Sequence, residues 1–183
     1  RSQVIIQTMH GTPFKTFGLD VTEEMPTDKE KMRVVRRARV WDYLVAQGVF
    51  TKSMAWQWFR YNNTVLETGY PRTDRLYHFD EEAATALKQS LGIPADKKVI
   101  LYAPTWRDST DGGKNYEIQP PIHFDIWKSE LGSDYIVLFR AHHLTTKVLG
   151  VQFDDFVRDY SEYNNVNDLM IVSDLLITDY SAI

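Results

Sequence analysis

The stretch Lys98-Val99-Ile100-Leu101-Tyr102-Ala103-Pro104-Thr105-Trp106 decides the fold class of the chain. Its β-branched and aromatic residues predict a strand over residues 98–103, which Pro104 ends. A helix-like stretch, Glu81–Leu91, precedes this strand, and a helix near 124–131 and a second strand, Tyr135–Phe139, follow it. Apolar runs that alternate with helices in this order are typical of α/β proteins with parallel sheets.

The same alternation covers the rest of the chain. Toward the first residue we expect a buried strand over Val4–Thr8, a helix over about 28–39, a short strand over Trp41–Ala46, a helix that Thr51 caps and that runs to Arg60, and a strand over Val65–Thr68. In the other half Asp80 is the expected cap of the 81–91 helix, residues 108–121 predict a loop, a short helix begins at Asn167 or Asp168, and Leu175–Thr178 is the last strand. A hinge around residues 75–82 is expected to separate two units.

The composition excludes several classes of protein. With 183 residues, 43% of them hydrophobic and 25% charged, the chain has the make-up of a folded globular protein. The absence of cysteine excludes disulfides, a thiolate nucleophile and a thiolate zinc site. The formal net charge of −4 gives no reason to expect nucleic-acid binding. No signal peptide and no run of about 20 apolar residues is present, so the sequence predicts no membrane-spanning segment.

Five motifs follow predicted strands at their carboxyl ends. They are His10-Gly11-Thr12-Pro13, Gly69-Tyr70-Pro71-Arg72, Pro104-Thr105-Trp106-Arg107, Arg140-Ala141-His142-His143 and Thr178-Asp179-Tyr180-Ser181. Open parallel sheets bind their ligands outside the carboxyl ends of the strands. This placement therefore predicts a ligand site more strongly than any one motif does.

Two of these motifs contain candidates for proton transfer or for phosphate binding. His10 is either a general base or a hydrogen-bond donor to a phosphate, because histidine titrates near neutral pH, or a loop histidine that caps or packs. Arg140 and His142 alternate along a strand exit and are expected to point the same way, with His143 on the other side in a structural role. An arginine there can bind a phosphate in bidentate fashion or form a salt bridge with one of the carboxylates.

Ser181 and Thr105 each allow two interpretations. Ser181 stands where a helix should begin, so it either faces an anion or is an ordinary N-cap. The same two interpretations apply to Thr105, at the end of the 98–103 strand. The sequence has no phosphate-binding P-loop and no GxGxxG dinucleotide motif. No metal-ligand spacing is present either, and we expect no metal and no cofactor.

A basic stretch, Lys29–Arg39, is followed by aromatic residues up to Phe59. A basic helix beside tryptophans can lie on an anionic membrane surface, which predicts peripheral membrane contact through residues 29–59. The alternative is a solvated helix face beside core aromatics.

Taken together, the motifs resemble the CDP-glycerol glycerophosphotransferase family, the teichoic-acid polymerases and primases of Gram-positive bacteria. The matching blocks, in the order of the family, are residues 9–15, 68–74, 100–107, 140–142, 166–169 and 173–181. Met9 departs from the family, which usually has an aromatic residue there, and Ala182 replaces its second serine.

The resemblance implies a GT-B-like α/β fold with two Rossmann-like units, both incomplete in what we expect to be an internal piece of a longer protein. Residues 1–78 would form the end of the first, acceptor-side unit, and residues 79–183 most of the second, which binds the CDP donor. The implied reaction transfers glycerol phosphate from CDP-glycerol to the hydroxyl of a lipid-linked polyol-phosphate acceptor and releases CMP. The implied place is the cytoplasmic face of the cell membrane, where cell-wall polymer is made.

The resemblance also assigns the site residues. Donor binding would fall to His10, Gly11, Thr12, Pro13, Phe14, Arg72, Pro104, Thr105, Arg140, Ala141, His142, Ser181 and Ala182. As catalytic residues we expect His10, which would deprotonate the attacking hydroxyl, and His142, which would act at the pyrophosphate. Two alternatives stay open: a ribitol-phosphate or nucleotide-sugar transferase on the same scaffold, and a non-catalytic nucleotide-binding fragment.

Overall fold

The computed structural model describes the chain except for residues 1–2, 13–15, 22–26, 106–115 and 180–183. The described part forms two compact units, of which the first ends at Asp74 and the second begins at Arg75. Sequence reasoning placed the second unit four residues later, at position 79. Arg75, the first residue of the second unit, pairs with Asp168 of the same unit.

The first unit is a three-stranded parallel sheet with two helices. Its strands are β1 (Ile6–Gln7), β2 (Tyr43–Ala46) and β3 (Thr64–Glu67), in the order β1-β2-β3. The helices are α1 (Asp28–Ala38), which begins with a capping box between Thr27 and Glu30, and α2 (Val49–Phe59). One 3-10 turn lies at Gly18–Asp20, and a second, Pro71–Leu76, runs from the end of this unit into the start of the next. Ala38 of α1, Leu44 of β2 and Ala55, Trp58 and Phe59 of α2 form the core.

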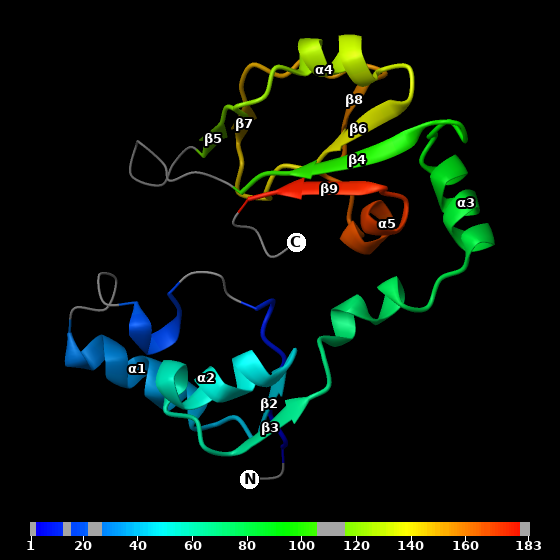
Figure 1. Cartoon of the computed structure of the whole chain (residues 1–183). Coiled ribbons are helices and arrows are strands. Elements are labelled where there is room, and N and C mark those ends of the chain that lie inside the picture. Colours follow the sequence, from blue (N-terminus) through cyan, green and yellow to red (C-terminus); the bar gives the residue numbers. More distant parts are fainter. Residues whose placement is uncertain (1–2, 13–15, 22–26, 106–115, 180–183) are drawn as a thin grey trace. The chain divides into compact units, whose positions relative to one another are not determined.

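The second unit is built on four parallel strands in the order β8-β6-β4-β9 (Figure 1). These are β4 (Lys98–Ala103), β6 (Tyr135–Phe139), β8 (Val157–Asp159) and β9 (Leu175–Thr178). The helices are α3 (Glu81–Ser90), α4 (Phe124–Leu131) and α5 (Val166–Ile171), and β5 (Glu117–Ile118) pairs with β7 (Lys147–Val148) in a small separate sheet.

The central strands of the second unit are buried on both faces. Ile100 and Tyr102 pack with Phe124 of α4, whereas Val99 and Leu101 pack with Leu169 of α5. Successive side chains of a strand point to opposite faces, so one apolar run supplies two cores. The helices α4 and α5 accordingly lie on opposite sides of the sheet in Figure 1.

The predicted elements of the second unit are confirmed closely. The strands at 98–103, 135–139 and 175–178 and the helix at 124–131 have the predicted bounds. Asp80 caps α3 by accepting a hydrogen bond from the amide of Ala83 at 2.7 Å. The short helix α5 begins at Val166, one or two residues before the predicted start, and β5, β7 and β8 were not predicted.

Two predictions for the first unit are wrong. Gly48, and not Thr51, is the N-cap of α2, and Thr51 is buried inside the helix. The strand expected to be buried over Val4–Thr8 is reduced to Ile6–Gln7, and Ile6 keeps 53% of its surface exposed. Within the described part, β1 pairs with β2 alone, so one edge of it has no neighbouring strand.

Candidate functional site

The carboxyl ends of three neighbouring strands meet at one edge of the second sheet. Tyr102 of β4 is in register with Phe139 of β6, and Ala103 of β4 is in register with Thr178 of β9. The segments that leave the sheet here are those that begin with Pro104, Arg140 and Asp179. The topology therefore brings three of the five predicted motifs to a single edge, which we call the second-unit edge.

Thr105 and Asp179 are bound to each other at this edge. The amide of Thr105 donates to the Oδ1 atom of Asp179 at 2.8 Å, and the hydroxyl of Thr105 donates to the same oxygen. Asp179 was not predicted as a site residue. The sequence feature that could have indicated it is its position directly after a predicted strand, as Thr105 lies close after another. The carboxylate thus links the ends of β4 and β9 and sets the orientation of Thr105.

Among the described residues, main-chain oxygens and not a carboxylate hold Arg140. Its Nη1 atom donates to the carbonyls of Tyr163 at 2.6 Å and Tyr160 at 3.1 Å. Burial lowers the pKa of the guanidinium, and the charge of Glu162 acts against that shift. The guanidinium of an arginine nevertheless stays protonated in proteins. One side of the guanidinium therefore anchors the loop between β8 and α5, and the charge remains at the second-unit edge.

The imidazole of His142 has a defined hydrogen-bonding state. The amide of Leu144 donates to its Nδ1 atom at 3.2 Å, so the proton of the neutral ring is carried by Nε2. Burial lowers the pKa of His142, and neighbouring His143 lowers it further. At neutral pH the ring is consequently a neutral donor through Nε2.

The prediction that His143 points away from His142 is wrong. The two rings lie 4.2 Å apart between centroids, with an angle of 34° between their planes. Strand alternation cannot place these side chains, because β6 ends at Phe139 and a turn follows. Beside them, Ala141 is buried and its amide donates to the hydroxyl of Ser161 at 3.0 Å, which fixes the backbone of this segment.

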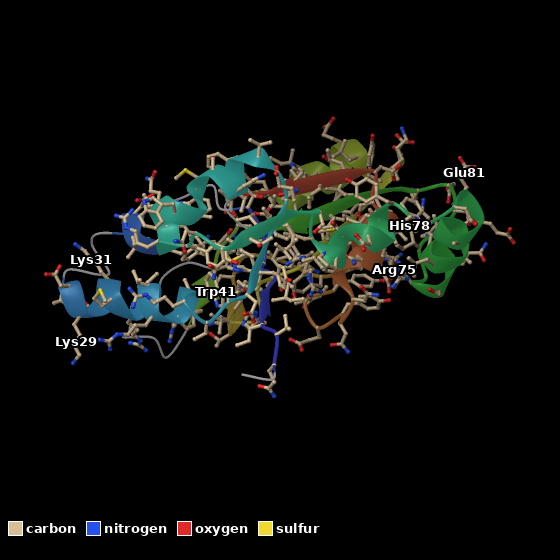
Figure 2. The ribbon with its side chains drawn as sticks, turned by 90° about the horizontal axis from the view of Figure 1, so that it is seen from below. Lys29, Lys31, Trp41, Arg75, His78 and Glu81 are labelled. Atoms are coloured by element: carbon tan, nitrogen blue, oxygen red, sulfur yellow. The ribbon has the colours of Figure 1, made fainter. Side chains whose placement is uncertain are left out.

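Asp168 supports the loop that Arg140 anchors. This carboxylate is 7% exposed and accepts from three side chains: Arg75 (2.6 Å), Tyr163 (2.9 Å) and Asn165 (3.1 Å). The hydrogen bond to Asp168 raises the pKa of the Tyr163 phenol, since it favours the protonated form. Figure 2 shows Arg75 on the segment that leads to α3. Asp168 was predicted only as a helix start, so its supporting role was missed.

In the first unit the carboxyl ends of the strands likewise carry the predicted residues, and we call this the first-unit edge. His10 is exposed beyond β1, and the Nη1 atom of Arg72 donates to its carbonyl at 2.9 Å. The hydroxyl of Thr12 donates to the side chain of Gln47, which directly follows β2. The amide of Gly69 donates to the carbonyl of Ala46 at 3.2 Å. The structure thus brings His10, Thr12 and Arg72 together.

A cavity of about 450 Å³ lies beside His10 in the first unit. Its lining includes Phe17, Trp41 and Phe59, and the charged side chain of Arg37 from α1. Sequence reasoning assigned Arg37 only to a basic helix face. It could not connect this residue with His10, because they come from different elements.

Four predicted binding residues, Pro13, Phe14, Ser181 and Ala182, lie outside the described residues. Of the remainder, Gly11 adjoins His10 with a φ of 153°, and Pro104 is buried next to Thr105. In the described ranges no three histidine or acidic side chains are grouped so that they could hold a metal ion.

The stretch predicted for membrane contact divides into core and surface. Trp58 and Phe59 are buried in the core of the first unit, whereas Phe50 and Trp56 on α2 are each 55% exposed. Figure 2 shows Lys29 and Lys31 extending away from α1. Among the helices that the structure describes, none is both long and apolar enough to cross a bilayer.

Comparisons with known proteins agree on one family. The family model described as CDP-glycerol:poly(glycerophosphate) glycerophosphotransferase matches residues 1–183. A teichoic acid poly(glycerol phosphate) polymerase of Bacillus subtilis (strain 168) is 40% identical over 97% of this chain and 25% of its own length. A teichoic acid glycerol-phosphate transferase of Staphylococcus aureus (strain NCTC 8325 / PS 47) is 39% identical over 97% of this chain and 48% of its own. A ribitol-phosphate polymerase of the same strain is 33% identical over 100% of the chain and 33% of its own.

The solved structures agree with the sequence comparison. The wall teichoic acid polymerase TagF has a TM-score of 0.85 and 38% identity, over 98% of this chain and 46% of its own. A TagF variant soaked with CDPG has a TM-score of 0.82 and 37% identity, over 98% of this chain and 44% of its own. The predicted α/β, GT-B-like fold class is confirmed. The chain spans about half or less of the length of these relatives.

Proposed function

Because the chain belongs to the CDP-glycerol:poly(glycerophosphate) glycerophosphotransferase family, we propose that its two edges serve the transfer of glycerol phosphate from CDP-glycerol to the hydroxyl of a lipid-linked acceptor. CMP is the leaving group. The observation that carries the proposal is the register of β6, β4 and β9, which gathers Arg140, His142 and Thr105 at one sheet edge. Such an edge is where parallel α/β sheets bind nucleotides.

The second-unit edge suits the donor pyrophosphate. Phosphoryl transfer requires mainly positioning and stabilisation of the charge on the phosphate oxygens. Arg140 supplies a fixed positive charge, and neutral His142 supplies an Nε2 hydrogen-bond donor. In this proposal they hold the pyrophosphate while the bond between the transferred phosphorus and the bridging oxygen breaks and CMP departs with the bond's electron pair.

The first-unit edge suits the nucleophile. His10 is exposed, and its backbone is held by the hydrogen bond from Arg72 to its carbonyl. In the proposal the imidazole accepts the proton of the acceptor hydroxyl as the oxygen forms its bond to phosphorus, which is the task of a general base. Gly11, Thr12, Pro13 and Phe14 complete the proposed loop, and Ser181 and Ala182 remain proposed contacts of the phosphates.

The donor choice is tested by offering several nucleotides to the intact protein. With an acceptor present, CMP release is expected from CDP-glycerol and little product from CDP-ribitol or UDP-sugars. Faster turnover of CDP-ribitol would favour the ribitol alternative, for which the 33% identical ribitol-phosphate polymerase is the specific reason. Calorimetric binding of CDP-glycerol without any CMP release would favour the non-catalytic alternative.

We further propose that the protein works at the cytoplasmic face of the membrane, as a peripheral protein. The support is the basic side chains of α1 and, on the contacting helix α2, the exposed side chains of Val49, Phe50 and Trp56. Such a combination favours anionic lipid surfaces. The intact protein is expected to sediment with vesicles that contain phosphatidylglycerol and to stay in solution with phosphatidylcholine alone. Equal behaviour with both would count against this location.

A further inference from the structure

We propose that the cavity beside His10 binds the terminal glycerol phosphate of the acceptor, and that Arg37 pairs with the phosphodiester of that unit. The inference rests on the proposed function and names the acceptor subsite within it. It assigns a specificity role to a residue that neither the motifs nor the family description single out.

The walls of the cavity include three closely packed aromatic side chains, Phe17, Trp41 and Phe59. The ring centroids of Phe17 and Phe59 lie 5.7 Å apart, and those of Trp41 and Phe59 lie 5.2 Å apart, both edge to face. Gly18 approaches α2 so closely that a Cβ atom there would lie 2.4 Å from the carbonyl oxygen of Trp58. The space of about 450 Å³ is therefore held open by packing and lies within the usual range of small-molecule sites, about 300–1,000 Å³.

One end of the cavity is organised around the proposed base. Met9 adopts a left-handed conformation with a φ of 57°, and its amide donates to the Oε1 atom of Gln7 at 3.0 Å. Left-handed backbone at a non-glycine residue costs free energy and is concentrated at functional sites. Met9, Gln7 and His10 all line the cavity, so the strained turn sets the position of the imidazole beside it.

The positive charge in the lining is Arg37. It is exposed in the last turn of α1, and no carboxylate of the described residues pairs with it. Its neighbour Arg36 is also exposed but does not line the cavity. A guanidinium that has no counter-ion among the described residues and lies next to apolar walls is suited to a phosphate group.

The chemistry of the acceptor matches this arrangement. In a chain of glycerol phosphate units, a single glycerol separates the attacking hydroxyl from the nearest phosphodiester anion. If His10 takes the hydroxyl proton, this anion must lie close to His10, and the cavity brings Arg37 to the same place. The carbon chain of the glycerol can then contact the aromatic walls formed by Phe17 and Trp41.

The test compares Arg37→Gln with the matched control Arg36→Gln in the intact protein. The acceptor is a short glycerol phosphate oligomer. We expect Arg37→Gln to raise the KM for this acceptor about tenfold to a hundredfold, the usual cost of losing a charged hydrogen bond. The KM for CDP-glycerol should stay within about twofold, and Arg37→Lys should restore part of the loss. Arg36→Gln should leave both KM values unchanged.

A second measurement separates this inference from the proposed function. Calorimetry with the oligomer alone reports acceptor binding without turnover, and it should show weaker binding in Arg37→Gln. An oligomer whose phosphates are esterified to neutral triesters should bind wild type and variant equally. An unchanged acceptor affinity in Arg37→Gln, or an equal loss for the neutral oligomer, would overturn the assignment. Absence of CMP release by an oligomer-binding wild-type protein would overturn the proposed reaction and leave the subsite standing.

Discussion

The substitution Asp168→Asn removes one charge from the centre of the loop support in the second unit. The Asp168 carboxylate accepts from Arg75, Tyr163 and Asn165 while only 7% exposed. Tyr163 also offers its carbonyl to Arg140 at 2.6 Å. A change at Asp168 is therefore expected to act on both the stability of the unit and the position of Arg140.

The magnitude follows from the contacts. The Arg75 side chain is 50% exposed, so solvent screening limits its ion pair with Asp168 to less than about 1 kcal/mol. Asparagine keeps one acceptor oxygen, but the buried hydrogen bond from Tyr163 loses its charged acceptor, which costs about 1 kcal/mol. We expect a total loss of about 1–2 kcal/mol in the free energy of unfolding.

Urea denaturation followed by tryptophan fluorescence measures this loss in the intact protein. Asp155→Asn is the matched control, because Asp155 is exposed and its side chain has no partner among the described residues. A second assay, the KM for CDP-glycerol, should rise in Asp168→Asn and not in the control. An unfolding free energy of Asp168→Asn within about 0.5 kcal/mol of wild type would refute the reasoning. A surface substitution at a residue without partners usually changes the free energy of unfolding by no more than this.

Four further outcomes are expected. Replacing His143 by alanine removes one of the two causes that lower the pKa of His142, so that pKa should rise in an NMR titration, and a fall would contradict the ring geometry. In the wild-type protein, stability from neutral His142 is full above the unfolded value near 6.5 and declines as the pH falls from there toward the lowered pKa, which urea unfolding at several pH values would show. Asp179→Ala removes the acceptor that orients Thr105 and should raise the KM for CDP-glycerol about tenfold in steady-state assays, so an unchanged KM would exclude a positioning role. Leu101→Ala, at a fully buried position, should lower the free energy of unfolding by about 2–5 kcal/mol in urea, and a loss below about 1 kcal/mol would contradict its place in the core.

The strands β4 and β6 could be predicted to the residue because both of their faces are buried. A run such as Val99-Ile100-Leu101 must be apolar throughout, and Gly, Pro or polar residues end it sharply. The strand β8, Val157–Asp159, has no such run. It forms because the Oδ1 atom of Asp154 accepts from the amides of Phe156 and Val157 and turns the chain against β6. The position of β8 therefore depends on the hydrogen bonds of Asp154 and on pairing with β6, and it could not be predicted from the residue composition of the segment.

The candidate site was predictable in its location and only partly in its contacts. Strand ends are visible in the sequence, so Thr105, Arg140 and His142 could be placed at one edge. The partners of Arg140 could not be predicted, because they are main-chain carbonyls that any residue type supplies. The side of His143 was predicted wrongly for a related reason: strand alternation stops where the strand stops, at Phe139.

The central claim is tested most directly by measuring CMP release from CDP-glycerol. The intact wild-type protein is compared with its His10→Ala and His142→Ala variants. His123→Ala is the control, because this exposed histidine precedes α4 and belongs to neither edge. We expect both site variants to lose about a hundredfold or more in CMP release, as loss of a proton-transfer or phosphate-binding group does. The control should retain wild-type activity. Near wild-type release in both site variants would contradict the assignment of the chemistry to the two strand-end edges.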